Sequence, residues 1–465
     1  MDHPQRVPRN LCRVRESAFL PKITSIGPYH YGGKGLELME EHKERFLMRL
    51  LGGKFNESED DDQSSSPLSM GDDEKRKAPH LRDLVDAMRK LEQRTRECYS
   101  EDFDASISSD KFVCMMVRDG CFVFELLRLY YKYDNGKGKS NEHLASDPIF
   151  NARWMLRTLQ RDLPKLENQL PYFVLKMLLK LTSWGQEKMK LEELTVTFFD
   201  PSSPRETVTS KLNFALTVDG KKQQFARMLD VLRSTFLKTV RDKVNQNGWT
   251  PIPHLHNNNS LLSSHNNHVE KPRLREKQLI HFMSELREAG VKLQKRDDHD
   301  LLDIAFEDRT LYMSPFFIDN NSVPLFLNFI AYEQCDGRAK PFFTNYFMFL
   351  DRLINSSDDI RILHEQGIIN HALGSTDNVA TLLNKLCREM VYDNDQCYLS
   401  NEMNEANKHC ETYYSSKYLR WWGNLIRDYF SSPWTFLSLL AAIVLLILTV
   451  IQTFYTVYPY YRPSS

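Results

Sequence analysis

The feature that most constrains this chain is a long apolar run near its C-terminus. Residues 434–454 read WTFLSLLAAIVLLILTVIQTF and contain no charged side chain. As an α-helix rising 1.5 Å per residue, this run would be about 30 Å long, which matches the hydrocarbon core of a bilayer. Aromatic residues lie on both sides of it, as in the interfacial belts of membrane proteins: Trp421, Trp422, Trp434, Tyr455 and Tyr458. We therefore predict one transmembrane helix over residues 433–455, with a short tail at 456–465; a buried core helix is the alternative.

The charges around this run predict how such a protein would be oriented. Residues 1–30 carry charges and prolines and include no apolar stretch of signal-peptide type, so we expect no signal peptide. Lys417, Arg420 and Arg427 precede the run, whereas Arg462 alone follows it. The positive-inside rule then places the body in the cytosol. We expect a tail-anchored, single-pass protein of the plasma membrane or endoplasmic reticulum, with an extracytosolic body as the alternative.

Composition restricts the class of partner. The chain has 465 residues, of which 41% are hydrophobic, and a formal net charge of −1. Such a balance gives no basic excess for nucleic-acid binding, and the length allows more than one packed subdomain. The eight cysteines form no C-x-x-C pair, which favours reduced, buried thiols over a disulfide scaffold.

Two low-complexity segments divide the body. Residues 56–79 are acidic and Ser-rich, and residues 245–272 are rich in Asn, His, Ser and Pro. Neither has enough apolar residues to offset the entropy of ordering, so we predict disordered loops. The remaining pieces are an N-terminal part (1–55), a helical middle part (80–244) and a C-terminal part (273–432) that ends in a juxtamembrane helix.

Apolar spacing of three and four residues predicts helices over most of the body. It recurs in 111–131, 151–163, 171–181, 224–240, 275–289, 345–353, 358–364 and 376–391. The exception is 291–318, where Leu302, Ile304 and Phe306 and then Leu311 and Met313 alternate with polar residues around a turn, as in a β-hairpin. The predicted fold is mainly α: a multi-helix globular body with a small antiparallel β-hairpin and one C-terminal transmembrane helix.

Six residues, LENQLP at 166–171, form the sharpest polar motif. Glu167, Asn168 and Gln169 lie between apolar runs. Glu167 in apolar surroundings could act as a general base with a raised pKa. A structural turn, whose side chains bond free N–H groups of a helix beginning at Pro171, is the interpretation that we favour.

Asp119 and Glu125 raise the same question within the most apolar helix of the body. Both lie close in sequence to an arginine, Arg118 and Arg128 respectively. A catalytic pair of carboxylates is one interpretation. We favour buried ion pairs, because an unpaired charge in that position would be costly.

No motif points to a cofactor or a metal. The histidines at 254, 256, 265 and 268 lie in an Asn-rich segment without the fixed scaffold of a zinc site. The glycines of YHYGGKG lack the full phosphate-loop pattern, and no hydrolase, kinase or metalloprotease signature is present. We therefore predict no catalytic, cofactor-binding or metal-binding residues.

Several segments together resemble a plant-specific family of membrane proteins, known as domain of unknown function 247 or uncharacterised protein family 0481. The resemblance rests on SIGPYH at 25–30, LENQLP at 166–171, NFIAYEQC at 328–335 and RWWGNLIRDYFSSPW at 420–434, in that order. It implies a largely helical, single-span protein with no established activity or cofactor, and some members are tied to self-recognition between pollen and pistil.

These observations predict a non-enzymatic recognition or scaffolding protein at a membrane, with an unidentified protein partner. The alternative is a membrane-surface enzyme that uses Glu167, Asp119 or Glu125 as its acid or base. The oligomeric state is left open.

Overall fold

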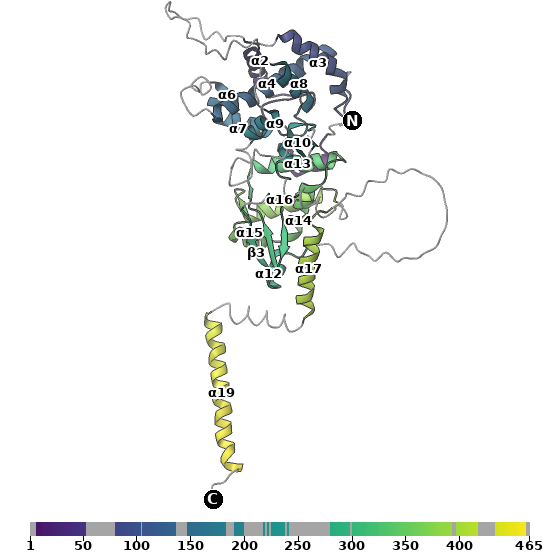
Figure 1. Cartoon of the computed structure of the whole chain (residues 1–465). Helices are drawn as coiled ribbons and strands as arrows, with labels where there is room; N and C mark the ends of the chain where they lie inside the picture. Colours follow the sequence, from purple (N-terminus) through teal and green to yellow (C-terminus); the bar gives the residue numbers. More distant parts are fainter. Residues whose placement is uncertain are drawn as a thin grey trace, which may run out of the picture.

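The computed structural model shows two lobes that follow one another along the chain (Figure 1). It describes residues 6–52, 80–103, 105–135, 147–182, 190–199, 217–218, 221–222, 225–237, 240, 280–297, 300–392, 397–416 and 433–461. The two predicted disordered loops, 56–79 and 245–272, and Trp421 and Trp422 lie outside these residues. The N-terminal lobe is helical, and the C-terminal lobe combines helices with short strands.

Helix α4 (Ser109–Asn135) is the centre of the N-terminal lobe. Its side chains from Phe112 to Leu127 are almost all buried, because helices surround it on several sides. Those that pack against it are α2 (Leu38–Leu50), α3 (Leu81–Arg96), α8 (Tyr172–Leu181) and α9 (Leu191–Phe199). Gly120 lets α8 approach closely, since an added Cβ would lie 2.5 Å from Cδ1 of Leu178.

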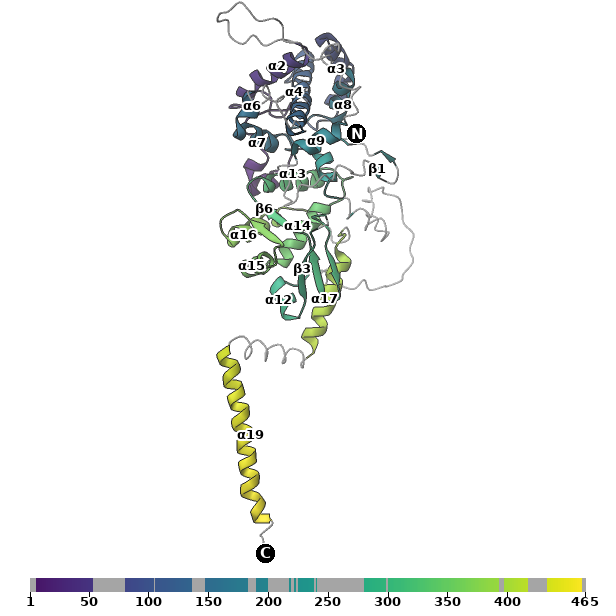
Figure 2. The ribbon, with the colours of Figure 1, turned by 60° about the vertical axis from the view of Figure 1, so that its left-hand side comes forward.

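Shorter elements complete this lobe along its flank. They are α1 (Arg9–Val14), the 3-10 helix η1 (Glu16–Ala18), α6 (Pro148–Asn151), α7 (Arg153–Asp162), the strands β1 (Thr217–Val218) and β2 (Lys221–Lys222), and α10 (Met228–Ser234). In Figure 2, α2, α6 and α7 follow one another down one side of the lobe.

The C-terminal lobe contains two small sheets. Strands β3 (Lys292–Lys295), β4 (Ala305–Glu307) and β5 (Thr310–Met313) form one sheet in the order β3-β5-β4, and β6 (Phe316–Ile318) pairs in parallel with β7 (Ile369–His371). The predicted antiparallel hairpin is present as β4 and β5, with Glu307 opposite Thr310. Its turn residues Asp308 and Arg309 both have positive φ, as in a type I′ turn. The parallel pairing of β3 with β5 was not predicted.

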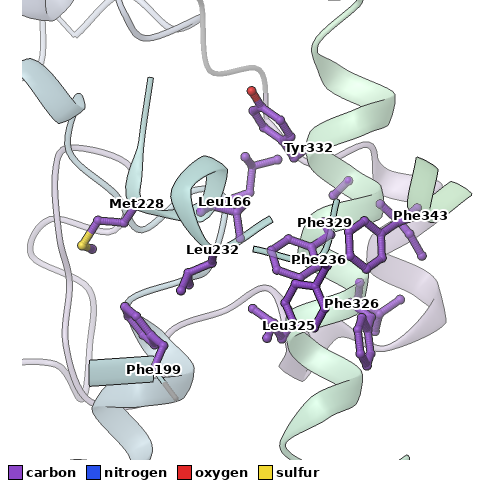
Figure 3. Close-up of a cluster of buried hydrophobic side chains, with 14 of the residues drawn as sticks. Leu166, Phe199, Met228, Leu232, Phe236, Leu325, Phe326, Phe329, Tyr332 and Phe343 are labelled. Carbon is purple, nitrogen blue, oxygen red and sulfur yellow. The ribbon is translucent and has the colours of Figure 1, made fainter. Parts of the chain in front are cut away.

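In the described part of this lobe, six helices pack around these strands. They are α12 (Met283–Glu288), α13 (Ser322–Cys335), α14 (Phe342–Leu353), α15 (Ser357–Glu365), α16 (Thr376–Arg388) and α17 (Ser400–Ser415). Helix α13 is buried on all sides and contacts η1 and α10 of the other lobe. Figure 3 shows Phe236 among Phe326, Phe329 and Phe343, so the two lobes share one hydrophobic core.

The C-terminal run forms helix α19 (Pro433–Tyr461), but it does not meet the requirement for a membrane span. Within the residues that the structure describes, no helix is both long and apolar enough to cross a bilayer. This finding contradicts the predicted transmembrane helix at 433–455, and the fold class is corrected to a mainly helical protein with a few strands.

Candidate functional site

Three of the polar residues singled out in the sequence, Glu167, Asn168 and Asp119, contact the N-terminal segment, residues 6–30. Asn168 lies in the turn between α7 and α8 and is completely buried. Its Oδ1 accepts the N–H of Ile26 at 2.7 Å, and its Nδ2 donates to the carbonyls of Thr24 and Asp162 at 3.1 and 3.0 Å. All the hydrogen-bonding groups of this amide are thereby directed at backbone, which fixes the segment on the turn.

Asp162, at the end of α7, binds the same segment a few residues before Ile26. Its Oδ2 accepts the N–H groups of Lys22 and Ile23, each at 2.8 Å. Lys165 lies 2.8 Å from the other carboxylate oxygen and donates to the carbonyl of Leu20. Sequence reasoning missed both residues, because their partners are backbone groups some 140 positions away and no local pattern marks them.

Glu167 contacts the start of the N-terminal segment. Its Oε1 accepts the N–H of Val7 at 2.8 Å, and its Oε2 lies 3.6 Å from Nε2 of His30. Burial raises the pKa of Glu167, and the Val7 hydrogen bond opposes the rise. Burial lowers the pKa of His30 to about 4, so the imidazole is neutral at pH 7, and the positive charge that lowers the pKa of Glu167 comes from Arg6.

Two cysteines contact the same part of the segment. The Cys335 thiol donates to the carbonyl of Arg6 at 3.6 Å, and the Cys12 thiol lies 4.0 Å from the carbonyl of Val7. Burial raises the pKa of both thiols, that of Cys335 to about 11, and the charge of Glu167 adds to the effect. Both therefore remain protonated at pH 7, a state that opposes nucleophilic chemistry at this cluster.

Gln169 joins the turn to α10. Its Oε1 accepts the N–H of Leu229 at 2.9 Å, and its Nε2 donates to the carbonyls of Pro164 and Lys165. These contacts differ from the predicted one with the helix that begins near Pro171, since α8 has no side-chain cap. The polar motif contacts distant backbone instead, at Val7, Ile26 and Leu229.

Asp119 lies on α4 and binds the segment from the opposite side. Its Oδ2 accepts the N–H of Gly27 at 2.9 Å, and its Oδ1 lies 2.8 Å from Nζ of Lys43 on α2. Lys43 is almost completely buried and also reaches Glu40, at 2.6 Å, and the carbonyl of Ser25. Burial raises the pKa of Asp119, and the positive charge of Lys43 opposes this rise.

Glu125 does not join this network. It pairs with Arg128 one turn along α4, with its two oxygens 2.7 and 2.5 Å from Nε and a terminal nitrogen of the guanidinium. Arg118, the other arginine close in sequence, pairs with Glu40 on α2. Glu125 and Asp119 therefore have different partners, and the structure does not bring them together as an acid–base pair.

Another buried ion pair, absent from the sequence-based candidates, joins the two lobes. Arg233 of α10 lies 2.6 Å from Glu333 of α13. The Glu333 carboxylate also accepts the N–H groups of Phe343 and Thr344 in the first turn of α14. The signal available in the sequence was an acidic residue inside the apolar run NFIAYEQC.

A small apolar cavity lies between β6, α13, α14 and α16. It measures about 20 Å³, is lined by Phe316, Phe326, Leu386 and other apolar side chains, and includes none of the candidate carboxylates. A cavity of this size holds at most one water, and one without polar groups stays dry. Among the described residues, no three metal-ligating side chains meet.

The remaining candidates lie on α19 or beyond the described residues. Trp434 and Tyr455 are exposed, at 79% and 70%. Trp421 and Trp422 fall outside the described part of the chain, as does the side chain of Tyr458. These positions stay predictions.

Sequence comparisons identify relatives along the whole length of the chain. The profile of a plant family described as "Plant protein of unknown function", DUF247, matches residues 5–448. The UPF0481 protein At3g47200 of Arabidopsis thaliana is 27% identical over 96% of this chain and 84% of its own length. The putative UPF0481 protein At3g02645 of the same plant is 22% identical over 97% of this chain and 89% of its own. No solved structure matches.

Proposed function

The chain belongs to DUF247, a family of plant proteins of unknown function, and from this premise and the geometry above we propose that it is a non-enzymatic recognition or scaffolding protein that binds another protein. The observation that supports the proposal most is the direction of its buried carboxylates. Glu167 and Asp119 accept backbone N–H groups of the N-terminal segment, and Glu125 binds Arg128.

An acid or base must reach a proton on a substrate, within hydrogen-bond distance or through one water. Asp119 and Glu125 are 1% and 0% exposed, and every contact of theirs given above is internal. Glu167 is more accessible, with a side chain 12% exposed, but its neighbours are a neutral histidine and protonated thiols. This arrangement supports a structural role for the three carboxylates.

Large apolar side chains on the surface of the body support a binding role. Trp154 on α7 is 57% exposed, and Leu81 on α3 and Val391 after α16 are 45% and 78% exposed. Tryptophan is enriched among the residues that dominate the energy of protein interfaces. These three positions mark separate faces on which a partner could bind.

Site-specific photo-crosslinking tests the proposal. A photoreactive amino acid at position 154, 81 or 391 of the full chain, expressed in plant tissue, should give a discrete adduct with one protein from at least one position. Buried position 329 is the matched control, because Phe329 has no exposed surface. The proposal fails if none of the three exposed positions yields an adduct above the position-329 background.

A further inference from the structure

Helix α7 presents a cationic surface with an aromatic residue beside it. Arg153, Arg157 and Arg161 recur every four residues, and Trp154 lies beside them on the outer arc of the helix. Arg153 and Arg157 are exposed, and Arg161 is half-buried. The residues of α7 that face the core are Met155, Leu159 and Gln160, and its one acidic residue, Asp162, is buried against the N-terminal segment. We call Arg153, Trp154, Arg157 and Arg161 the α7 face.

Among the residues that the structure describes, the arginines at the two ends of the α7 face lack acidic partners. Neither Arg153 nor Arg161 forms an ion pair with a carboxylate of the described residues. The Nε of Arg161 is buried and has no hydrogen-bond acceptor among these residues. A guanidinium without an acidic partner can bind a carboxylate of another molecule through its accessible N–H groups.

The positive surface continues beyond both ends of the helix. At its N-terminal end, Asp147 caps α6 and is held between Arg45 and Arg49 of α2, so one carboxylate faces two arginines. At its C-terminal end lies Lys165, whose pKa is lowered mainly by burial. The positive charges of Lys22 and Arg161 lower this pKa further, and the negative charge of Asp162 opposes the shift. In Figure 2 the elements α2, α6 and α7 follow one another along one side of the lobe.

We propose that the α7 face is the docking site for an acidic segment of a protein partner, in which an aromatic or aliphatic side chain packs on Trp154. This inference rests on the proposed binding function and names its site and the chemistry of its partner. Carboxylates of the segment pair with Arg153 and Arg161 through bidentate contacts, which arginine forms better than lysine. Trp154 supplies the apolar contact area that charges alone do not give.

The chemistry of the site favours an acidic peptide over nucleic acid. The net charge of the whole chain is −1, and the three arginines of the α7 face lie on one short helix. Helix α7 is 10 residues long, or about 15 Å, which suits a short peptide. A protein that tracks a nucleic-acid backbone presents a broader basic surface and a domain with a basic isoelectric point, whereas this chain has a pI near 6.9.

Fluorescence anisotropy with the full chain tests the proposal. The probe is a short fluorescein-labelled peptide rich in Asp and Glu with one central Phe. Trp154→Ala should weaken its binding about tenfold or more, and Arg153→Glu should weaken it several-fold, as for central and charged interface residues. Raising the salt from about 0.05 to about 0.5 M should also weaken binding, because the Debye length shortens.

Matched controls separate this site from general attraction. Arg82→Glu makes the same charge change on α3, where Arg82 is highly exposed, and should leave binding within about twofold. Leu181→Ala removes an exposed apolar side chain on α8 and should also be neutral. Arg153→Lys should retain part of the affinity that Arg153→Glu loses.

Four results would overturn the proposal: no measurable binding of the probe, equal binding of a peptide with Asn and Gln in place of its acids, equal loss in Arg82→Glu, or tighter binding of a single-stranded RNA of the same length. Crosslinking from position 81 or 391 with no binding at the α7 face would overturn this inference alone and leave the proposed function standing.

Discussion

The buried pair of Asp119 and Lys43 allows the sharpest test of the polar network. Each side chain is 1% exposed, and the two charged groups lie 2.8 Å apart. Asp119→Asn keeps the shape of the side chain and an acceptor for the N–H of Gly27, but it leaves Lys43 charged in the core with Glu40 as its remaining carboxylate. Glu40 is 33% exposed and pairs with Arg118 as well, so it compensates only in part.

The expected loss follows from the cost of an unpaired buried charge. Breaking a buried pair costs about 3–5 kcal/mol, and we expect about 3 kcal/mol for Asp119→Asn because Glu40 and Ser25 still hold Lys43. Lys43→Met leaves Asp119 unpaired and should cost about 3–5 kcal/mol. The double variant has no buried charge at this site and loses mainly the hydrogen bond to Ser25, so it should cost about 1–2 kcal/mol.

Native-state hydrogen exchange at the amides of α4 measures these losses where the pair acts, because core amides report the larger opening free energies. Asp110→Ala on the same helix is the control: Asp110 is 80% exposed and its pair with Arg89 should contribute less than about 1 kcal/mol. The reasoning is refuted if Asp119→Asn costs less than about 1 kcal/mol, or if the losses of the two single variants add in the double variant.

Three further predictions concern the same lobe. Gly120→Ala should destabilise by about 1–3 kcal/mol in urea unfolding, because the new methyl group meets Leu178, and Leu178→Val should recover part of the loss; a stabilised Gly120→Ala would contradict the close packing. Asn168→Ala removes three buried hydrogen bonds and should cost about 3 kcal/mol, with faster exchange at the Ile26 amide; an unchanged Ile26 rate would contradict the contact. Because folded His30 has a pKa of about 4, the unfolded state binds more protons, so stability should fall as the pH drops from about 6.5 to about 4. His30→Gln should lack that component of the slope, and an identical pH profile in both proteins would contradict it.

The spacing of apolar residues predicted the amphipathic helices and the hairpin. It did not predict elements that are buried on every side or only a few residues long. The spacing at 111–131 indicated α4, and alternation around residues 307–309 indicated the hairpin of β4 and β5. Helix α13 was not predicted from spacing, because it is buried on every side and so lacks a polar face. Strand β7 is three residues long and pairs with β6 about 50 positions earlier, which leaves no periodic signal.

In the candidate site, the sequence likewise indicated some of the residues but not their partners. The motif LENQLP drew attention to Glu167, Asn168 and Gln169, but their partners are backbone N–H groups at Val7, Ile26 and Leu229, and such groups carry no side-chain signature. The α7 face was missed for another reason. Its arginines recur at helical spacing in residues 153–161, which in sequence alone is typical of any solvated helix surface.

One comparison tests the central claim, that this protein works by binding through its surface and not by chemistry at its buried carboxylates. The partner captured by crosslinking is to be titrated against the folded variants Trp154→Ala and Glu167→Gln. The account predicts that Trp154→Ala weakens binding about tenfold or more, whereas Glu167→Gln binds like the unmodified chain. Binding that survives Trp154→Ala, together with a turnover of substrate that Glu167→Gln abolishes without loss of fold, would contradict it.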